Sequence, residues 1–480
     1  MNKQLRRVST FVLLMFVSLF VSTTIIQYFQ KDNLQSDGRN ARSIYASFQS
    51  ERGQILVDGE PIAYSEPIDD RYNYQRVYPA GPIYATVTGY FSVQPSTGGL
   101  EGELNSFLTG DSDAQFLDRL NAMLTGRDPQ GASVELTIDP VVQQAAWDAL
   151  GDYIGAVVAI DPRTGAILAL VSKPTYDPNA LAVHDPDAVE ANYEALLADP
   201  GDPLIDRGIS GDLNPPGSTF KLVVTAAALE SGQYTPDSTF PNPTSLTLPG
   251  TSTNITNSAD SNCGGGGEAT LATALRLSCN IPFAQLAGAL GDDAIRDQAE
   301  KVGFGDSFDI PMPTEPSSYP QTESEAETWL TGFGQASVRT TPLQMAMVSA
   351  AIANGGSLMR PTLVESIVAP DLSVLETLQP QEYSRPLSPE NAATLTQMMV
   401  AGVSNGVANN ARIDGVEVAG KTGTAENGPG EPYTLWFTGF APANDPRVAV
   451  AVVLEDRQTG FGNLLAAPIA RSVMEAVLSR

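Results

Sequence analysis

The sequence predicts a mixed α/β fold of the α+β type, in which one β-sheet is assembled from strands far apart along the chain. Apolar strand-like runs occur near residues 155–171 and return after residue 416, with a long helical stretch between them. Strands from both ends that enclose a helical middle favour one sheet with helices packed around it. Shorter β-type segments precede this domain, and an uninterrupted apolar segment begins the chain.

Composition limits the classes of protein to which the chain can belong. Of 480 residues, 42% are hydrophobic and 17% are charged, which is enough apolar material for a large packed core. The formal net charge of -28 would repel phosphate groups, so no nucleic-acid partner is expected. One histidine and two cysteines exclude zinc fingers, multi-histidine metal centres and any Ser-His-Asp triad without His184. We expect no metal, no cofactor and a solvated loop position for His184.

The N-terminal segment has the length of a membrane-spanning helix. Residues 8–30 contain no charged side chain, and residues 8–26 are dominated by Val, Leu, Phe, Met and Ile. The preceding Lys3, Arg6 and Arg7 favour a cytoplasmic N-terminus, so we expect a single-pass plasma-membrane protein with an extracytoplasmic main domain. The alternative is a cleaved signal peptide, but the apolar run exceeds the roughly 7–15 residues of a signal core and no A-x-A-like site follows.

The two cysteines can form a disulfide in that compartment, because thiols oxidise outside the cytoplasm. Cys263 and Cys279 would then close a short loop and contribute about 3 kcal/mol if the bond is unstrained. The glycine run at 264–267 is flexible enough to bring them together. We expect the bridge, and the alternative is two unpaired cysteines with one of them buried.

The segments that follow the apolar helix indicate a small domain of short strands. Residues 53–57 lead into Asp58-Gly59, a strong hairpin signal. Near residues 126–131 the pattern changes to a longer strand-like run, and Asp139-Pro140 then begins a helix. We therefore place the main boundary here. The expected parts are an anchor over 1–30, a small pedestal domain over 31–130 and a main domain over 131–480.

The main domain opens with a predicted β-hairpin. Residues 155–160 and 166–171 form two almost wholly apolar arms around the turn at 161–165. Uniformly apolar strands are typical of a sheet that is covered on both faces. The other expected elements are helices within 218–302 on either side of a Pro- and Gly-rich break at 236–267, a helix at 342–354, strands at 416–424, 434–440 and 448–454, and an amphipathic helix at 469–478.

A serine and a lysine three positions apart begin the first of these helices. On a helix, Ser218 and Lys221 would share one face and lie within reach of each other. A buried lysine can lose its proton near neutral pH, so Lys221 would be a base and Ser218 its nucleophile without any histidine. For an isolated S-x-x-K the alternative is an N-cap serine followed by a solvated lysine.

Two further motifs support the catalytic interpretation. Ser278 and Asn280 follow a helical run, where a hydroxyl and a carboxamide can project into a cleft as proton relay and hydrogen-bond clamp. In Lys421-Thr422-Gly423-Thr424 the two threonines share one face of a strand-like run, and the glycine would let a substrate backbone approach closely. Chance is a poor explanation for three such motifs in the order S-x-x-K, S-x-N and K-T-G.

The three motifs together resemble those of the penicillin-binding and serine β-lactamase superfamily. The resemblance implies a transpeptidase fold with a central antiparallel sheet, flanking helices and a helical subdomain, on a β-rich, dimerisation-like pedestal whose motifs are structural. Within the class B branch it points to the actinobacterial penicillin-binding protein A group. The segments that carry it are 172–179, 334–336 and 341–346 in the main domain, and Arg39-Asn40, Glu51-Arg52-Gly53-Gln54-Ile55 and Gly99-Leu100-Glu101 in the pedestal.

The resemblance also implies an acyl-transfer cycle on the D-Ala-D-Ala end of a peptidoglycan stem peptide. Ser218, activated by Lys221, would attack the penultimate D-Ala carbonyl, and backbone N–H groups of Ser218 and Thr424 would form the oxyanion hole. β-Lactams would imitate the substrate and stop at the acyl stage. The other implied roles are proton transfer to the departing D-Ala by Ser278, a hold on the substrate amide by Asn280, positive potential from Lys421, and carboxylate binding by Thr422 and Thr424.

The implied partners are nascent peptidoglycan and a polytopic glycan polymerase, in cell-wall synthesis and division. Two alternatives remain open: a D,D-carboxypeptidase or β-lactamase on the same scaffold, and a catalytically silent division scaffold. The nearest approach to a β-lactamase E-x-x-L-N segment, residues 327–331, ends in threonine. Ile281-Pro282 departs from the family, where Thr and a small or apolar residue are more frequent. Trp436 and Phe437 are expected to pack in the core, and the alternative is contact with the stem peptide near a cleft.

Overall fold

The computed structural model describes residues 2–30, 48, 50–94, 97–116, 119, 124–125, 130–211, 213–257, 262–428 and 430–480. Two sequence predictions fall outside these residues. They are the pedestal motif Arg39-Asn40 and most of the boundary segment, residues 126–129.

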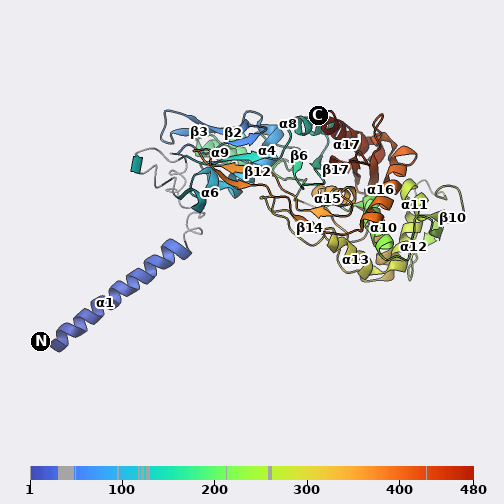
Figure 1. The fold of residues 1–480 in the computed structure, drawn as a ribbon, viewed down its shortest axis with the longest axis horizontal. Helices are drawn as coiled ribbons and strands as arrows, with labels where there is room; N and C mark the ends of the chain where they lie inside the picture. The colour runs from blue at the N-terminus through green and yellow to red at the C-terminus, as the bar shows by residue number, and fades with distance from the viewer. Residues whose placement is uncertain are drawn as a thin grey trace.

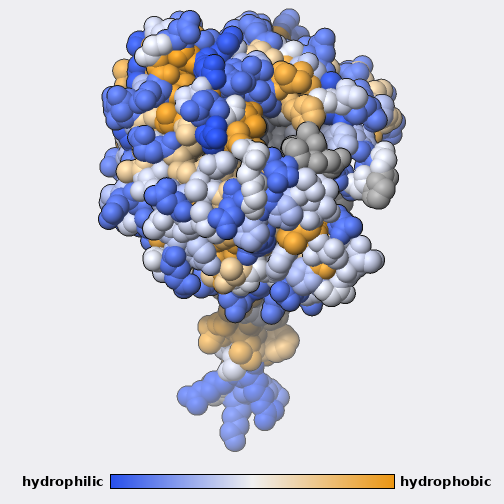
Figure 2. Space-filling model, turned by 90° about the vertical axis from the view of Figure 1, so that its right-hand side faces the viewer, coloured by the Kyte–Doolittle hydropathy of each residue, from blue (hydrophilic) through white to orange (hydrophobic). Residues whose placement is uncertain are grey.

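The N-terminal helix α1 (Asn2–Thr24) continues into a π-helical turn, η1 (Ile25–Phe29). Within the described part of the chain, Lys3–Phe29 is the one helix long and apolar enough to cross a membrane, and none of its apolar window is buried. Figure 1 shows this helix projecting from the rest of the protein. In Figure 2 it is an orange stem with a blue tip below a largely blue and white body. The predicted apolar segment is therefore one continuous, uncovered helix.

The pedestal contains a six-stranded sheet in the order β13-β12-β4-β1-β2-β3. Asp58 and Gly59, with φ of 53° and 76°, form the tight turn between β1 and β2, so the predicted hairpin is confirmed. Short helices accompany the strands in the described part of the pedestal, and the sequence did not indicate these helices. The elements are β1 (Ile55–Val57), β2 (Glu60–Pro67), β3 (Tyr74–Val77), β4 (Ser133–Leu136), β12 (Val364–Val368), β13 (Val374–Thr377), α4 (Gly81–Thr88), α5 (Gly99–Glu103), α6 (Asn105–Leu108) and the 3-10 turn η2 (Asp113–Gln115).

This sheet combines strands from both sides of the predicted boundary near residue 130. β4 runs parallel to β1 with Ile55 opposite Val134, and β12 runs antiparallel to β4 with Ile367 opposite Val134. A division of the chain at residue 130 therefore separates strands of one sheet. An alternating apolar pattern marks a strand but does not identify its partner, because pairing is a contact between distant segments.

A buried ionic cluster lies beneath the pedestal strands. Arg52 Nε lies 2.5 Å from Glu101 Oε2, and Arg76 Nε lies 2.6 Å from Glu101 Oε1. Burial by itself would raise the pKa of Glu101, but the charges of Arg76 and Arg52 hold it below its usual value. Gly53 lies against Ala132, whose carbonyl oxygen would be 1.9 Å from any added Cβ, so these pedestal motif residues are in structural contacts.

The main domain is built on an antiparallel five-stranded sheet in the order β15-β16-β17-β5-β6. β17 lies beside β5, with Val452 opposite Val157, so strands from the two ends of the domain meet in one sheet as predicted. Every residue of β5 is buried. The strands are β5 (Gly155–Ile160), β6 (Ile167–Lys173), β15 (Ala419–Glu426), β16 (Tyr433–Ala441) and β17 (Val448–Arg457).

Helices cover both faces of this sheet, as the apolar strands predict. Val157 and Ala159 share a core with α8 (Pro140–Leu150) and α17 (Gly462–Leu478), whereas Ala156 and Val158 share another with α10 (Lys221–Glu230) and α15 (Pro342–Ala353). α17 begins earlier than the predicted residue 469 and contains Pro468. Trp436 and Phe437 are fully buried, which confirms their predicted core positions.

A helical subdomain lies beside the sheet, at the right of Figure 1. Its helices are α11 (Leu271–Leu277), α12 (Asn280–Leu290), α13 (Asp292–Lys301), α14 (Glu325–Thr331) and α16 (Pro389–Ser404). Short strand pairs are β7 (Thr239–Pro241) with β10 (Glu268–Thr270), β8 (Ser245–Thr247) with β9 (Asn254–Thr256), and β11 (Leu358–Met359) with β14 (Glu382–Ser384). The remaining helices are α9 (Pro186–Leu197), η3 (Pro178–Leu181), η4 (Gly217–Thr219) and η6 (Asn409–Ala411).

The expectation that His184 is a solvated loop residue is wrong. Its side chain is 9% exposed, and Nδ1 lies 2.7 Å from Asp70 Oδ2. The ring packs against Phe48 and Tyr72 with centroid distances of 5.2 and 4.5 Å. His184 lies in a loop that packs on the pedestal, and its sequence neighbours carry no sign of that contact.

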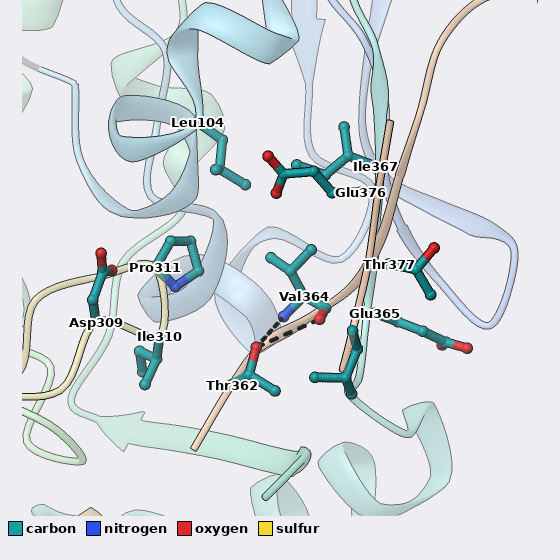
Figure 3. A pocket seen from close by; sticks show the side chains of 11 residues that line it. Leu104, Asp309, Ile310, Pro311, Thr362, Val364, Glu365, Ile367, Glu376 and Thr377 are labelled. Atoms are coloured by element: carbon teal, nitrogen blue, oxygen red, sulfur yellow. Dashed lines mark hydrogen bonds between the residues drawn. The ribbon is translucent and has the colours of Figure 1, made fainter. Parts of the chain in front are cut away.

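A cavity of about 240 Å³ lies at the junction of the pedestal and the main domain. Figure 3 shows Val364 and Glu376 on the β12–β13 ribbon, with Leu104, Asp309 and Pro311 across the space. None of its lining residues belongs to the S-x-x-K, S-x-N or K-T-G motif. The candidate catalytic groups therefore lie elsewhere.

Candidate active site

The candidate nucleophile Ser218 lies in η4, the single 3-10 turn that leads into α10. Gly217 has φ of 52°, and its N–H donates to the Gly334 carbonyl at 3.0 Å. The buried indole Nε1 of Trp436 donates to the Pro215 carbonyl at 3.0 Å. Ser218 is half-buried between fully buried neighbours, so the turn is held by contacts with two other segments.

Lys221 is the first residue of α10 and is fully buried. Its Nζ donates to the Ser278 carbonyl at 2.8 Å and to Asn280 Oδ1 at 2.9 Å, and it lies 3.3 Å from Ser278 Oγ. The pKa of Lys221 is well below its usual value. Burial is the larger cause, and the positive charge of Lys421 is the smaller one. A lowered pKa favours the neutral form of the Lys221 amine, and this form can accept a proton.

Lys421 on β15 approaches the same serine from the other side. Its Nζ donates to Ser278 Oγ at 2.8 Å and to the Thr422 carbonyl at 2.7 Å. Burial lowers the pKa of Lys421 to about 7. The Ser278 hydroxyl thus lies between two buried amines, and within the described residues no carboxylate pairs with either of them. Such a hydroxyl can pass a proton from one nitrogen to another group.

The predicted pairing of Ser218 with Lys221 is only partly realised. The two residues lie on adjacent turns, as the spacing requires, but no hydrogen bond joins Ser218 Oγ to another described residue. The amine of Lys221 is instead bonded to the S-x-N residues Ser278 and Asn280. Helical spacing predicts which side chains share a face, but the tertiary neighbours decide which acceptor the amine uses. Catalytic hydrogen bonds are often long until substrate binds.

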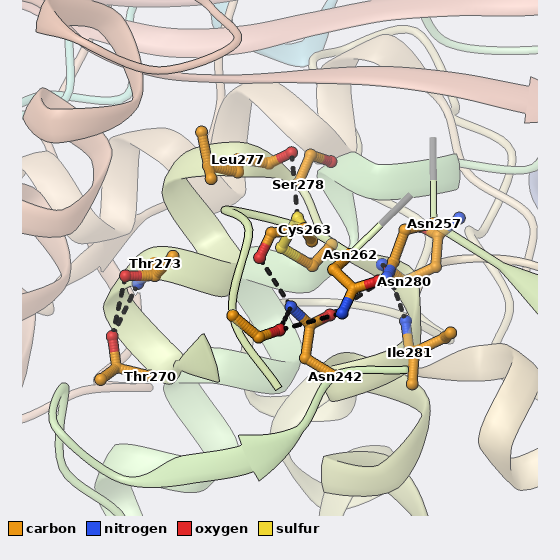
Figure 4. The surroundings of a disulfide bond; sticks show 12 residues. Asn242, Asn257, Asn262, Cys263, Thr270, Thr273, Leu277, Ser278, Asn280 and Ile281 are labelled. Atoms are coloured by element: carbon orange, nitrogen blue, oxygen red, sulfur yellow. Dashed lines mark hydrogen bonds between the residues drawn. A yellow bond between two sulfur atoms is a disulfide. The ribbon is translucent and has the colours of Figure 1, made fainter. Parts of the chain in front are cut away.

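Ser278 ends α11 in a left-handed conformation, with φ of 60° and ψ of 40°. This region is uncommon for residues other than glycine and is often found at functional sites. The next residue, Cys279, forms a disulfide with Cys263, with their Cα atoms 5.7 Å apart (Figure 4). The S-x-N serine is therefore held between a helix end and a covalent cross-link.

Asn280 begins α12, and its side chain is bonded at both ends. Oδ1 accepts from Lys221, and Nδ2 donates to the Thr256 carbonyl at 3.1 Å. The unusual Ile281-Pro282 falls in the first turn of α12, where proline is tolerated because its missing N–H has no helical acceptor. The departure from the family pattern is thus accommodated by the start of the helix.

The K-T-G segment lies inside β15, an edge strand that faces the serine turn. A Cβ at Gly423 would lie 3.0 Å from both the Pro216 carbonyl oxygen and Trp436 Cβ. The missing side chain therefore makes room for the protein's own serine turn, and the predicted approach of a substrate backbone to Gly423 stays a prediction. Thr424 Oγ1 accepts a hydrogen bond from Gly462 N–H at 3.4 Å, at the start of α17.

Sequence reasoning missed two groups that hold the site. Trp436 was expected to pack in the core or to contact the stem peptide, but a buried indole N–H also needs an acceptor and finds one at Pro215. Asn257, in the Pro- and Gly-rich break, accepts from the Asn280 backbone N–H at 2.9 Å. Asparagine is common in turns, so the residues around Asn257 gave no sign that its side chain contacts the S-x-N motif. No group of three or more described His, Cys, Asp or Glu side chains could hold a metal ion.

Comparisons with known proteins agree with this geometry. The family model described as "Penicillin binding protein transpeptidase domain" matches residues 155–475, and that described as "Penicillin binding protein A dimerisation domain" matches residues 52–134. The chain is 42% identical over 494 residues to "Peptidoglycan D,D-transpeptidase PbpA" of Mycolicibacterium smegmatis, covering 100% of this chain and 99% of that protein. It is also 42% identical over 491 residues to the protein of the same name in Mycobacterium tuberculosis, with the same coverage.

Solved structures show the same relationship. The ceftriaxone acyl-enzyme complex of penicillin-binding protein A from M. tuberculosis superimposes with a TM-score of 0.87 and 41% identity. It covers 90% of this chain and 100% of the solved chain. The penicillin G acyl-enzyme complex of the same protein gives a TM-score of 0.85 at 41% identity and covers 89% and 100% of the two chains. The predicted resemblance and fold class are confirmed.

Proposed function

Because the chain belongs to the penicillin-binding protein transpeptidase family, we propose that it is a peptidoglycan D,D-transpeptidase that forms its acyl-enzyme on Ser218. One observation carries the assignment of the residues. The Ser278 hydroxyl contacts both buried lysine amines, and one of these lysines, Lys221, begins the helix that follows the Ser218 turn. Two lysines without a carboxylate partner are costly to bury as cations, so they favour proton transfer over a purely structural role.

The first half of the reaction makes the acyl-enzyme. Ser218 Oγ attacks the carbonyl carbon of the penultimate D-Ala while its proton moves to the neutral amine of Lys221. The backbone N–H groups of Ser218 and Thr424 stabilise the oxyanion. When the peptide bond breaks, the proton passes from Lys221 through the Ser278 hydroxyl to the nitrogen of the departing D-Ala.

The second half transfers the acyl group. The amine of a neighbouring stem peptide attacks the ester carbonyl and gives up its proton to the same base, which forms the cross-link and returns Ser218 to its hydroxyl form. Asn280 holds the substrate amide, and Lys421 supplies positive potential near the terminal carboxylate. Thr422 and Thr424 on β15 bind that carboxylate.

β-Lactams test this assignment because they acylate the same serine. Intact-mass spectrometry of the full chain in detergent, with and without penicillin G, should show an adduct of one drug mass that maps to Ser218 and is absent from Ser218→Ala. An unmodified protein with hydrolysed drug would support the β-lactamase alternative, and an unmodified protein with intact drug would support the silent scaffold. Both outcomes would overturn the proposal.

The structure disfavours Glu327 as the water-activating base that a β-lactamase would need. Its Oε2 accepts from Glu323 N–H at 2.8 Å, and its Oε1 accepts from Ser337 Oγ at 2.9 Å. Both oxygens are therefore bonded within the region around α14. The silent-scaffold alternative does not explain why two lysines are buried with no carboxylate partner among the described residues.

We further propose that the apolar helix anchors the protein in the plasma membrane. The basic Lys3, Arg6 and Arg7 favour a cytoplasmic N-terminus and an extracytoplasmic catalytic domain. Residues 1–30 then form the anchor, 31–130 the larger part of the pedestal, and 131–480 the catalytic domain together with the pedestal strands β4, β12 and β13. The proposed partner is a polytopic glycan polymerase in cell-wall synthesis and division. Protease added outside intact spheroplasts should remove the catalytic domain, and its protection would contradict this orientation.

A further inference from the structure

A single side-chain oxygen holds the start of α12 from outside the helix. Asn257 Oδ1 accepts from the backbone N–H of Asn280 at 2.9 Å and of Ile281 at 3.0 Å (Figure 4). The residue at the N-cap position, Cys279, makes no side-chain cap. Since the first backbone N–H groups of a helix have no helical acceptor, Asn257 performs the capping function across the chain.

The amide of Asn257 is itself held in one orientation. Its Nδ2 donates to Asn242 Oδ1 at 3.1 Å, and Asn242 Nδ2 donates to the Cys263 carbonyl at 2.7 Å. Asn257 is 2% exposed and Asn242 is fully buried. Because Nδ2 must donate to Asn242, the oxygen is turned toward α12. A hydrogen-bonded chain thus runs from the disulfide loop to the S-x-N motif.

Two consecutive residues hold different parts of Asn280. Thr256 accepts from the side-chain Nδ2, whereas Asn257 accepts from the backbone N–H. The remaining polar atom of that side chain, Oδ1, accepts from Lys221 Nζ. The backbone of Asn280 follows directly on Cys279 and the left-handed Ser278, so a shift at α12 would move every acceptor of the Lys221 amine.

We propose that Asn257 is a positioning residue for acylation, which keeps Ser278 and Asn280 in place relative to the Lys221 amine. It touches neither Ser218 nor the two lysines in its described contacts and acts through the backbone of the S-x-N motif. The inference rests on the proposed acylation of Ser218. A displacement of about 1 Å of catalytic groups can lower a rate about 100-fold.

The test compares Asn257→Ala with a matched cap far from the site. Asp139 Oδ1 likewise accepts from two backbone N–H groups, those of Val141 at 2.9 Å and Val142 at 3.1 Å, at the start of α8. Asp139 also pairs with Arg480. Full-length wild type, Asn257→Ala and Asp139→Ala in detergent are each mixed with a fluorescent penicillin, and the acylation rate constant and the Tm are measured.

We expect Asn257→Ala to acylate about 10- to 100-fold more slowly, and Asp139→Ala to acylate within about twofold of wild type despite a comparable loss in Tm. Wild-type acylation rates for Asn257→Ala, or equal losses in both variants, would overturn the inference. Failure of the wild type to acylate would instead overturn the proposed function.

A second variant separates positioning from general destabilisation. Asn257→Asp keeps an oxygen for the two backbone N–H groups but places a negative charge behind Asn280. Its second oxygen faces Asn242 Oδ1 in place of the Nδ2 donor, so any rescue should be partial. Because the oxygen is retained, we expect faster acylation than in Asn257→Ala. The charge favours the protonated form of the Lys221 amine, so the acidic limit of acylation, the pH below which the rate falls, should move to higher pH. The proposal would be contradicted if Asn257→Asp kept the wild-type Tm but showed no faster acylation than Asn257→Ala and no shift in its pH dependence.

Discussion

Two buried clusters of this protein each contain two basic side chains, and they differ in one group. In the pedestal, Glu101 pairs with both Arg52 and Arg76 at 2.5 and 2.6 Å. In the candidate active site, the neutral hydroxyl of Ser278 lies between Lys221 and Lys421.

The missing carboxylate changes what the basic groups can do. In the pedestal the arginines stay charged, and their charges hold the pKa of Glu101 below its usual value despite burial. In the site, burial lowers the pKa of both lysines, to about 7 for Lys421. A buried ion pair fixes structure, whereas buried amines with neutral partners can exchange protons near pH 7.

Removing one amine should have the largest effect on activity. Lys221→Met deletes the proposed base, so acylation by a fluorescent penicillin should fall about 1,000-fold or more. Unfolding in denaturant should change by less than about 2 kcal/mol, because the lost hydrogen bonds are to neutral groups. Near wild-type acylation would contradict the idea that this amine is chemically different from the pedestal arginines.

Removing the pedestal carboxylate should instead lower the stability strongly and the acylation rate only slightly. Glu101→Gln leaves Arg52 and Arg76 buried without an anion, so the free energy of unfolding should fall by about 3–5 kcal/mol. The acylation rate constant of the protein that remains folded should stay within a few-fold of wild type. A stable Glu101→Gln variant would show that the cluster is not held by the ion pairs.

Adding a carboxylate to the site should make it resemble the pedestal. Asn280→Asp places an anion on the atom that accepts from Lys221 Nζ at 2.9 Å, which favours the protonated amine. We expect the acidic limit of the acylation rate to move up by about one to two pH units, with a rate about 10- to 100-fold lower at pH 7. Asn192→Asp, on α9, is the control, because the Asn192 amide also donates to a backbone carbonyl, and it should leave the limit unchanged.

The pH dependence of stability tests the second amine, that of Lys421, by itself. Lys421 has a pKa of about 7 when folded and an ordinary value of 10.5, so between those pH values the unfolded chain binds more protons. The stability of the wild type should therefore rise with pH in that window, by up to about 1.4 kcal/mol per unit from this group. The difference between wild type and Lys421→Met in denaturant titrations at pH 7 and 9 isolates this contribution, and a pH-independent difference would contradict it.

Local patterns were sufficient to predict most helices and strands. Asp58-Gly59 predicted the pedestal hairpin, and Asp139-Pro140 predicted the start of α8, because turn and cap preferences act over a few residues. The apolar runs at β5 and β17 predicted strands that are covered on both faces. These signals depend only on neighbours in sequence.

Other features depend on contacts between distant segments, which a single sequence does not display. β4 pairs in the pedestal sheet, His184 packs on Asp70, and Gly423 lies against the serine turn. In each case the residues next to it in sequence are equally compatible with a different contact. The boundary near residue 130 is affected for the same reason, since strands on both sides of it pair in one sheet.

The sequence by itself determined the type of chemistry, since a serine, two lysines and a nearly histidine-free chain leave few nucleophilic mechanisms. Only the tertiary structure decided the protonation of the lysines and their partners. The pKa of a side chain depends on its burial and on the charges around it, and those are set by elements such as α10, α11 and β15 meeting in space. The same physical reason explains why Asn257, far from every motif in its local pattern, came to hold the backbone of Asn280.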